Sequence, residues 1–435
     1  MPQQTKIRMR IAFISHEFPP DTDHGGIGNY VLRASAMLTD RGHTVEIFAG
    51  SGTRDGTFTE GGILVHRVRD MRSELFSKAV AGVFRQRHRE LPFDVMESPE
   101  YCFEGLEAAR QSPDLPLVVK LHTPSMLLAE LSGGFPAPTF LNTLKGHGQQ
   151  LRAFAGAIRH RRPLPRWHWN RHAFQSAMEF DAVERTLAQM ADVVASPSAA
   201  LLEMMAVRWD MNRENLMHVP SYVPPPRLLA VPIETATNVV SYFGRLETRK
   251  GVDDLATAIP LVLAEFPNAR FRFVGRIGSA PDGRRDFKTY IQDIVGNWRD
   301  KVEFTGFLPI EKMYDCYSLT DICVFPSRWE NAPNVCLEAM AAGRGVIGSS
   351  AGGMAEMLDG GKVGLLVQPH SPAEIAAAIL QLLRNPAERM RLGALARQRI
   401  LSEYNKDKII ASLEKSYTLA IQRHSSAKRI TNAED

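Results

Sequence analysis

The sequence predicts an α/β protein built from two doubly wound, Rossmann-like domains that face each other across a cleft. At 435 residues, the chain is longer than a single hydrophobic core usually supports. Short apolar segments alternate with helical patterns along most of its length, which is typical of parallel sheets covered by helices. A proline-rich stretch, VPPPRLLAVP at 223–232, divides these segments into two series and is the expected linker.

The first domain is expected at 1–223, with an insert at about 125–190 that is too long for an ordinary strand–helix connection. The insert is predicted to hold extra helices, one of them at 172–192, where apolar residues recur at helical spacing. Strands are expected at RIAFIS (10–15), TVEIFA (44–49), ILVHRV (63–68), FDVMES (93–98), PLVVKLH (116–122) and ADVVAS (191–196).

The second domain is expected at 233–404. Residues 405–435 are expected to form a C-terminal helix that packs back toward the first domain and ends in a polar tail. Strands are predicted at NVVSYFG (238–244), ARFRFVG (269–275), VEFTG (302–306), DICVFPS (321–327), GVIGSS (345–350) and VGLLV (363–367).

Composition excludes several other classes of protein. No stretch approaches the run of about 18 apolar residues that a membrane-spanning helix needs. The first apolar run is too short for a secretory signal and reads as a strand. The four cysteines show no C-x-x-C spacing, which disfavours a disulfide framework or a zinc site. A reducing, cytoplasmic location is therefore expected.

The positive charge of the chain is concentrated in the insert. The formal net charge is +4, yet residues 131–178 contain no acid and seven lysines or arginines. Arginines mixed with Trp167 and Trp169 suit an acceptor site or an anionic membrane surface. A solvated helix face remains an alternative of similar weight. Nucleic acid is the least favoured partner, because no binding motif accompanies the charge.

Two cations follow the first strand of the second domain. In SYFGRLETRKG (241–251), the apolar strand ends at Gly244, and Arg245 and Lys250 lie in the loop before the next helix. Ligands of open α/β sheets bind beyond the carboxyl ends of the strands. Arg245 and Lys250 are therefore placed to hold an anion such as a diphosphate, although a solvated basic loop would carry the same residues.

A second motif, RWENAPNVCLEAMAAG (328–343), has an acid on each side of a predicted helix start. Pro333 suits the first helical position, and the backbone N–H groups of Asn334 and Val335 would be free to bind a phosphate. Glu330 precedes this helix start and Glu338 lies more than a turn beyond it. Two such acids could accept hydrogen bonds from hydroxyl groups at both ends of a nucleotide sugar.

These residues resemble those of a known family. FGRLETRKG, PSRWENAPNVCLEAMAAG and AGGMAEMLDGGKVGLLV are similar to the retaining, GT-B-fold glycosyltransferases of family 4, whose E-x7-E motif matches Glu330 and Glu338. The resemblance is strong over about 238–385. It implies that Arg245 and Lys250 bind the diphosphate of the donor. It also implies that Glu338 binds the ribose and that Glu330 contacts the donor sugar near the reacting carbon.

The resemblance is looser in the first domain. HEFPPDTDHGGIGNYV resembles the glycine-rich first loop of the family, in which Gly25, Gly26 and Gly28 would let the chain approach the donor. The strand end VVKLHTP would place His122 across the cleft from the donor sugar. Asn331 departs from the family pattern, because many members have glycine after the first glutamate.

Two other motifs have ordinary explanations. The D-T-D at 21–23 is similar to the metal-binding motif of a different transferase fold, but its position in a Pro/Gly loop favours a polar turn. With two cations to neutralise the diphosphate, no metal is expected to be needed. The glycine-rich loop could also be a dinucleotide fingerprint, but the second strand ends in Ala49 and Gly50 rather than in the required acid.

The sequence therefore predicts a metal-independent enzyme that moves a sugar from a nucleoside-diphosphate sugar to an acceptor hydroxyl with retention of configuration. The donor would be a UDP-, GDP- or ADP-sugar, and no other cofactor is expected. The resemblance implies a role in exopolysaccharide, lipopolysaccharide or glycolipid biosynthesis, and a peripheral position at the inner membrane surface is a further expectation. A sugar phosphorylase or synthase of the same fold, or a non-catalytic nucleotide-sugar-binding protein, remains an alternative.

Overall fold

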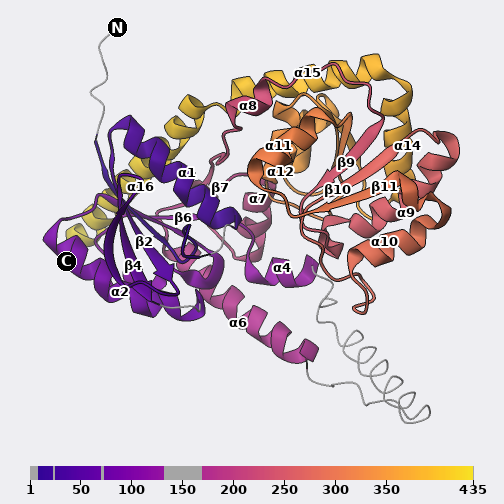
Figure 1. Ribbon diagram of the computed structural model, residues 1–435. Coiled ribbons are helices and arrows are strands. Elements are labelled where there is room, and N and C mark those ends of the chain that lie inside the picture. The colour runs from indigo at the N-terminus through magenta and orange to yellow at the C-terminus, as the bar shows by residue number, and fades with distance from the viewer. Residues whose placement is uncertain (1–7, 23–24, 70–72, 132–168, 435) are drawn as a thin grey trace, which may run out of the picture.

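A computed structural model describes residues 8–22, 25–69, 73–131 and 169–434, with the side chains of 73–74, 169–176 and 429–434 left out. Two α/β domains lie side by side, each built on its own parallel sheet (Figure 1). The predicted pair of Rossmann-like domains is therefore confirmed. Most of the basic segment expected at 131–178, residues 132–168, lies outside the described residues.

The sheet of the N-terminal domain has eight strands in the order β3-β4-β2-β1-β5-β6-β7-β8. All neighbours are parallel except β3 and β4, which form an antiparallel hairpin. Strand β1 is central and nearly fully buried, as expected of a parallel strand covered on both faces. The strands are β1 Arg10–Ser15, β2 Thr44–Ser51, β3 Gly56–Glu60, β4 Ile63–Arg69, β5 Val95–Pro99, β6 Leu117–Lys120, β7 Val193–Ser196 and β8 Leu216–His218.

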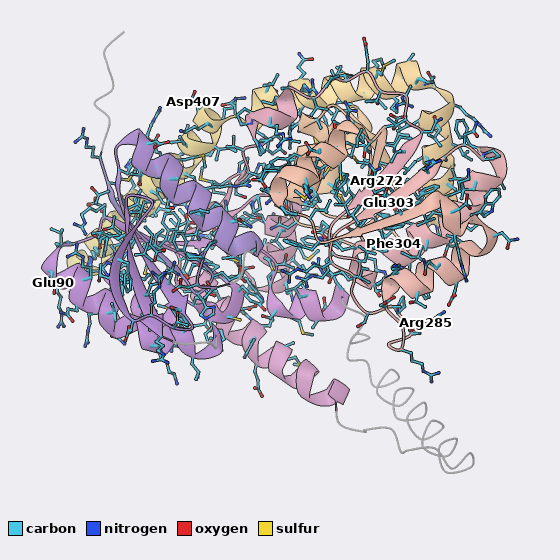
Figure 2. The ribbon with its side chains drawn as sticks, viewed as in Figure 1. Glu90, Arg272, Arg285, Glu303, Phe304 and Asp407 are labelled. Carbon is cyan, nitrogen blue, oxygen red and sulfur yellow. The ribbon has the colours of Figure 1, made fainter. Side chains whose placement is uncertain are left out.

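The sheet of the C-terminal domain has six parallel strands in the order β11-β10-β9-β12-β13-β14. On its outer strands, Arg272 of β10 and Glu303 of β11 pair at 2.8 Å, and Figure 2 shows the two side chains together. The strands are β9 Val239–Phe243, β10 Arg270–Val274, β11 Val302–Gly306, β12 Ile322–Phe325, β13 Gly345–Ser349 and β14 Leu365–Val367.

Helices cover both faces of each sheet, and each face has its own apolar cluster. The helices of the N-terminal domain are α1 Gly26–Arg41, α2 Ser73–Glu90, α3 Leu106–Gln111, α4 Ser125–Leu131, α6 Trp169–Met190 and α7 Ala199–Arg208. The linker contains α8 Pro226–Leu229. Those of the C-terminal domain are α9 Val252–Glu265, α10 Phe287–Val295, α11 Ile310–Ser318, α12 Asn334–Ala341, α13 Met354–Met357, α14 Pro372–Arg384 and α15 Pro386–Glu403.

The last helix, α16 (Lys406–Glu434), returns to the N-terminal domain and contacts α1, β5, β6 and β7 (Figure 1). Its buried residues Ile409, Ile410, Leu413 and Tyr417 belong to the apolar cluster on one face of the N-terminal sheet. The sequence predicted that the chain ends in a polar tail after this helix. Instead, the helix continues to Glu434, so the polar residues of the expected tail are helical.

Every predicted strand is present, and two strands were not predicted. Strand β3, GTFTE, is mostly exposed and carries a single aromatic residue, so it lacks the apolar run of a buried strand. Strand β8 is only three residues long. The helix expected at 172–192 is present as α6, Trp169–Met190.

Candidate active site

A cavity of about 650 Å³ lies between the two domains, beyond the carboxyl ends of the strands. Its N-terminal wall includes the glycine-rich loop and His122, and its C-terminal wall includes the loops that follow β9 and β12. Four permanently cationic side chains line it against three carboxylates. The cations are Arg33, Arg245, Arg249 and Lys250, and the carboxylates are Glu17, Glu247 and Glu330.

The cationic loop lies directly against the Glu330 loop. Lys250 forms an ion pair with Oε1 of Glu330, and Nη1 of Arg249 lies 3.2 Å from the same oxygen. Arg245 lies further out: its side chain is 65% exposed and is 3.7 Å from Glu247. Lys250 and Glu330 therefore compensate each other's charge, while the exposed guanidinium of Arg245 is accessible to a ligand.

Glu330 reaches the cavity from a loop that is fixed on both sides. A parallel β-bridge pairs its backbone with Gly352, and its carbonyl accepts a hydrogen bond from the N–H of Gly353 at 2.9 Å. The helix behind it begins at Asn334, with Pro333 as the N-cap rather than the first helical residue as predicted. Pro333 and Asn334 line the cavity, but Val335 does not.

Glu338 does not line the cavity, so the structure does not place it beside the other predicted ligand-binding residues. Its side chain is buried in α12 and both carboxylate oxygens are occupied. The hydroxyl of Tyr222 donates to one oxygen at 2.6 Å, and that of Tyr317 donates to the other at 3.0 Å. Burial raises the pKa of this carboxyl above its usual value. Tyr222 connects Glu338 to the cavity, because Tyr222 is itself a lining residue.

His122 follows β6 and lines the opposite wall. Its Nδ1 lies 3.0 Å from the carbonyl oxygen of Lys120. Because a carbonyl only accepts, Nδ1 carries the proton and Nε2 is the nitrogen left for a ligand. The main-chain N–H of His122 donates to both oxygens of buried Glu100 at 2.8 Å. The ring is therefore oriented by the Lys120 carbonyl, and the backbone of His122 is held by the carboxylate of Glu100.

The wall under His122 is supported by a buried polar network that includes the last helix. Tyr30 of α1 packs edge-on against the His122 ring at 5.6 Å and donates to Glu97 at 2.6 Å. Tyr417 of α16 donates to the other Glu97 oxygen at 2.8 Å. Burial raises the pKa of Glu97 and lowers that of nearby Lys120 to about 8. Helix α16 thus contributes to the geometry of the cavity wall.

The glycine-rich loop closes around Glu17, a residue that the sequence reasoning missed. The N–H of Gly28 lies 3.3 Å from Oε2 of Glu17 at the start of α1. A Cβ at Gly25 would lie 2.4 Å from the same oxygen, so a larger residue there would displace the Glu17 carboxylate. Gly25 and Gly26 line the cavity and Gly28 does not. An acid directly after the first strand, in HEFPP, was the available signal.

Two further lining cations were also missed. Arg249 precedes Lys250 in the sequence, and this position beside a predicted diphosphate-binding residue was a signal that it lines the same site. Arg33 lies in the second turn of α1, and its guanidinium stacks over the ring of Tyr222 at 4.5 Å. No sequence motif connects Arg33 to the site, because the contact joins α1 to a residue far along the chain, in the loop after β8.

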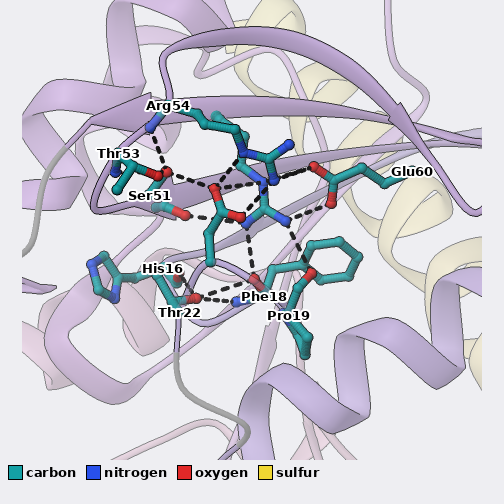
Figure 3. Close-up of polar contacts among 11 residues, drawn as sticks. His16, Phe18, Pro19, Thr22, Ser51, Thr53, Arg54 and Glu60 are labelled. Carbon is teal, nitrogen blue, oxygen red and sulfur yellow. Dashed lines mark hydrogen bonds and ion pairs between the residues drawn. The ribbon is translucent and has the colours of Figure 1, made fainter.

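The first acid of the D-T-D motif belongs to a structural turn, shown in Figure 3. Arg54 donates to the two oxygens of Asp21 at 2.8 and 2.6 Å, and Ser51 donates at 2.6 Å. The hydrogen bond from Arg54 lowers the pKa of Asp21 to about 2. Thr22 in the same turn donates to the carbonyl of His16 at 3.0 Å. Asp23 lies outside the described residues.

Comparison with known proteins matches each half of the chain to glycosyltransferases. Residues 25–221 match the family described as glycosyl transferase 4-like domain, and 237–385 match glycosyl transferases group 1. Together the two matches span most of the chain. The chain belongs to the glycosyltransferases.

Individual relatives agree with this assignment. The glycogen synthase of Mycobacterium tuberculosis is 26% identical over 95% of each chain. Among solved structures, sucrose-phosphate synthase from Thermosynechococcus elongatus superposes with a TM-score of 0.66, at 21% identity, covering 98% of this glycosyltransferase and 100% of that chain. Anabaena HepE, solved in complex with UDP, gives 0.65 at 18% identity, covering 94% and 100%. These likenesses show the GT-B fold. Among the described helices, none is long and apolar enough to cross a membrane.

Proposed function

We propose that this glycosyltransferase moves a sugar from a nucleoside-diphosphate sugar to an acceptor hydroxyl with retention of anomeric configuration. One observation carries the proposal. The cationic loop at 245–250, Glu330 and the start of α12 meet in a single interdomain cavity, with His122 opposite. The cationic loop and the helix start would face the anionic leaving group, and Glu330 beside them would face the positive charge that develops on the sugar.

The cations would act on the leaving group. When the bond between the anomeric carbon and the diphosphate breaks, its electron pair moves to the diphosphate oxygen. Arg245, Lys250 and the N–H groups at the start of α12 would stabilise that charge. The acceptor oxygen then forms the new bond to the anomeric carbon, and its proton passes to the departing diphosphate.

Glu330 would act on the sugar. Its carboxylate would orient the donor sugar and offset the positive charge that develops on the ring. Its ion pair with Lys250 supports this assignment, because the carboxylate lies in contact with the cation that would bind the diphosphate. An incoming diphosphate would compete for Lys250 and so release Glu330 toward the sugar.

Nothing in the cavity geometry selects one donor base. Anabaena HepE binds UDP, which makes a UDP-sugar the first donor to try. The test is incubation with a panel of UDP-, GDP- and ADP-sugars, measuring release of the nucleoside diphosphate with and without sugar acceptors. Release from one class of donor supports the proposal. Sugar 1-phosphate formed from phosphate and an oligosaccharide, with no turnover of any donor, would identify a phosphorylase instead.

We expect the reaction to proceed without a divalent metal, because cationic side chains and a helix start already face the diphosphate position. Treatment with EDTA followed by gel filtration should leave the rate of nucleoside-diphosphate release unchanged. Loss of activity on chelation, restored by Mn²⁺, would contradict this expectation.

The acceptor side is expected to engage an anionic partner through the basic insert, most directly a lipid-linked diphosphate sugar at the inner membrane surface. Helix α4 contributes Leu128 and Ala129 to the cavity and ends at Leu131, where the insert begins. Each basic residue near an anionic surface contributes about 1 kcal/mol, and salt weakens the attraction.

Co-sedimentation with anionic vesicles tests the role of the insert. Wild type should sediment with the vesicles at low salt, and binding should fall when Arg159, Arg161, Arg162 and Arg166 are all changed to Ser. Neutral vesicles serve as the control. Equal binding by both proteins would mean that the insert is a solvated face and that the acceptor is a soluble molecule.

A further inference from the structure

The loop that carries Glu330 lies at the interface between the two domains. Trp329, Glu330 and Asn331 are all buried, and Glu330 and Asn331 line the cavity. Trp329 joins the apolar cluster of the N-terminal domain. The two shortest hydrogen bonds of Asn331 are to Ser198 and His122 of the same domain, and longer ones reach Ser196 and Leu121 at 3.5 Å. The loop is therefore bound across the domain interface on both sides of the candidate catalytic acid.

Asn331 connects this loop to His122. Its Nδ2 donates to the carbonyl oxygen of His122 at 2.6 Å, and its Oδ1 accepts from the hydroxyl of Ser198 at 2.6 Å. The carbonyl can only accept, so the orientation of the amide is fixed by chemistry. The main-chain N–H of His122 is already held by Glu100. The carbonyl of His122 also accepts a hydrogen bond from the hydroxyl of Thr123 at 2.6 Å, so Asn331 adds the contact from the other domain to a backbone that its own domain already holds. A glycine at position 331 has no side chain to make this bond.

A second contact ties the same two units together. The carboxylate of Glu356 in α13 accepts hydrogen bonds from the N–H groups of Ala199 and Ala200 at 2.9 and 2.6 Å. These are the first residues of α7, where unpaired N–H groups and the helix dipole favour a negative charge. The two domains meet so closely here that a Cβ at Gly353 would lie 2.6 Å from the Cβ of Ser198.

Both contacts originate from one unit of the C-terminal domain. The β-bridge between Glu330 and Gly352 joins the Glu330 loop to the segment that leads into α13. Asn331 and Glu356 therefore move together with Glu330. When the domains separate, both contacts break at once, and His122 loses its fixed position relative to Glu330.

We propose that Asn331 is a positioning residue, which fixes the backbone of His122 relative to Glu330 in the closed enzyme, and that Glu356 is the second tie that holds the domains closed. The role of Asn331 in catalysis rests on the proposed function, whereas its contribution to holding the two domains together does not depend on that function. Asn331 thereby sets the separation of the two walls that would face the donor sugar.

The kinetic test is Asn331→Asp. The new side chain has the same size and still accepts from Ser198, but it places an oxygen against the carbonyl of His122. We expect kcat to fall about tenfold or more, since small misplacements of reacting groups are costly, while the donor KM changes less than about threefold. Ser198→Ala removes only the other bond and should reduce kcat far less. Glu203→Gln, at an exposed position of α7, is the matched control and should match wild type. Wild-type kcat in Asn331→Asp would overturn the positioning role.

Small-angle scattering tests the tie without requiring activity. The double variant Asn331→Ala, Glu356→Ala should have a larger radius of gyration than wild type at a temperature where both are folded by circular dichroism. An unchanged radius would overturn the tie. If wild type turns over no donor, the proposed function fails, yet a larger radius in the double variant still supports the tie between the domains.

Discussion

Replacing Glu330 with Gln is expected to lower kcat at least about a hundredfold while leaving the fold intact, since it removes the charge that would face the developing oxocarbenium. The amide has nearly the same size, and the backbone of this residue is held by the bridge to Gly352 rather than by its side chain. Steady-state release of nucleoside diphosphate, with the thermal transition as a check on folding, measures the effect.

Glu247→Gln is the matched control for this variant. Glu247 also lines the cavity and also pairs with Arg249, at 2.8 Å, but it lies on the cationic loop rather than before the start of α12. Its replacement should reduce kcat much less than that of Glu330. Near-wild-type turnover in Glu330→Gln, or equal losses in both variants, would refute the role assigned to Glu330.

Replacing Lys250 or Arg245 with Ala is expected to weaken binding of the nucleoside diphosphate by roughly 1.5–3 kcal/mol, the usual range for a charge-assisted hydrogen bond. Lys250 should lie at the upper end, because its side chain is only 18% exposed, and Arg245 at the lower end, because it is 65% exposed. Since about 1.4 kcal/mol is tenfold in Kd, the two variants should be clearly separable.

Isothermal titration with UDP, or with the diphosphate of the preferred donor, measures these affinities. Arg391→Ala removes an exposed cation on α15 and should bind like wild type. Wild-type affinity in both Lys250→Ala and Arg245→Ala would place the diphosphate elsewhere.

The sequence was sufficient for the parts of the fold and site that depend on local pattern. Buried parallel strands are continuous apolar runs, so β1 and β9 could be located within a residue or two. Glu330 and Lys250 were recognisable because each follows such a strand, and parallel strands bring their carboxyl ends to one edge. Strand β3 was missed because an exposed hairpin strand has no such run.

The environment of Glu338 could not be predicted from its spacing to Glu330. Its two hydrogen-bond donors are Tyr222, which lies in the loop after β8 of the N-terminal domain, and Tyr317 of α11. The function of Asn331 was equally hidden, because its partners His122 and Ser198 lie in the other domain. Contacts between domains depend on how the two sheets are placed, and no local pattern records that placement.

The stereochemistry of transfer tests the central claim most directly. With an α-linked nucleoside-diphosphate sugar as donor, the one-bond carbon–hydrogen coupling at the anomeric carbon of the first-formed product reports its configuration. The account predicts an α-linked product, formed at a rate that falls at least about a hundredfold in Glu330→Gln. A β-linked first product would contradict retention and the role of this cavity as a retaining glycosyltransferase site.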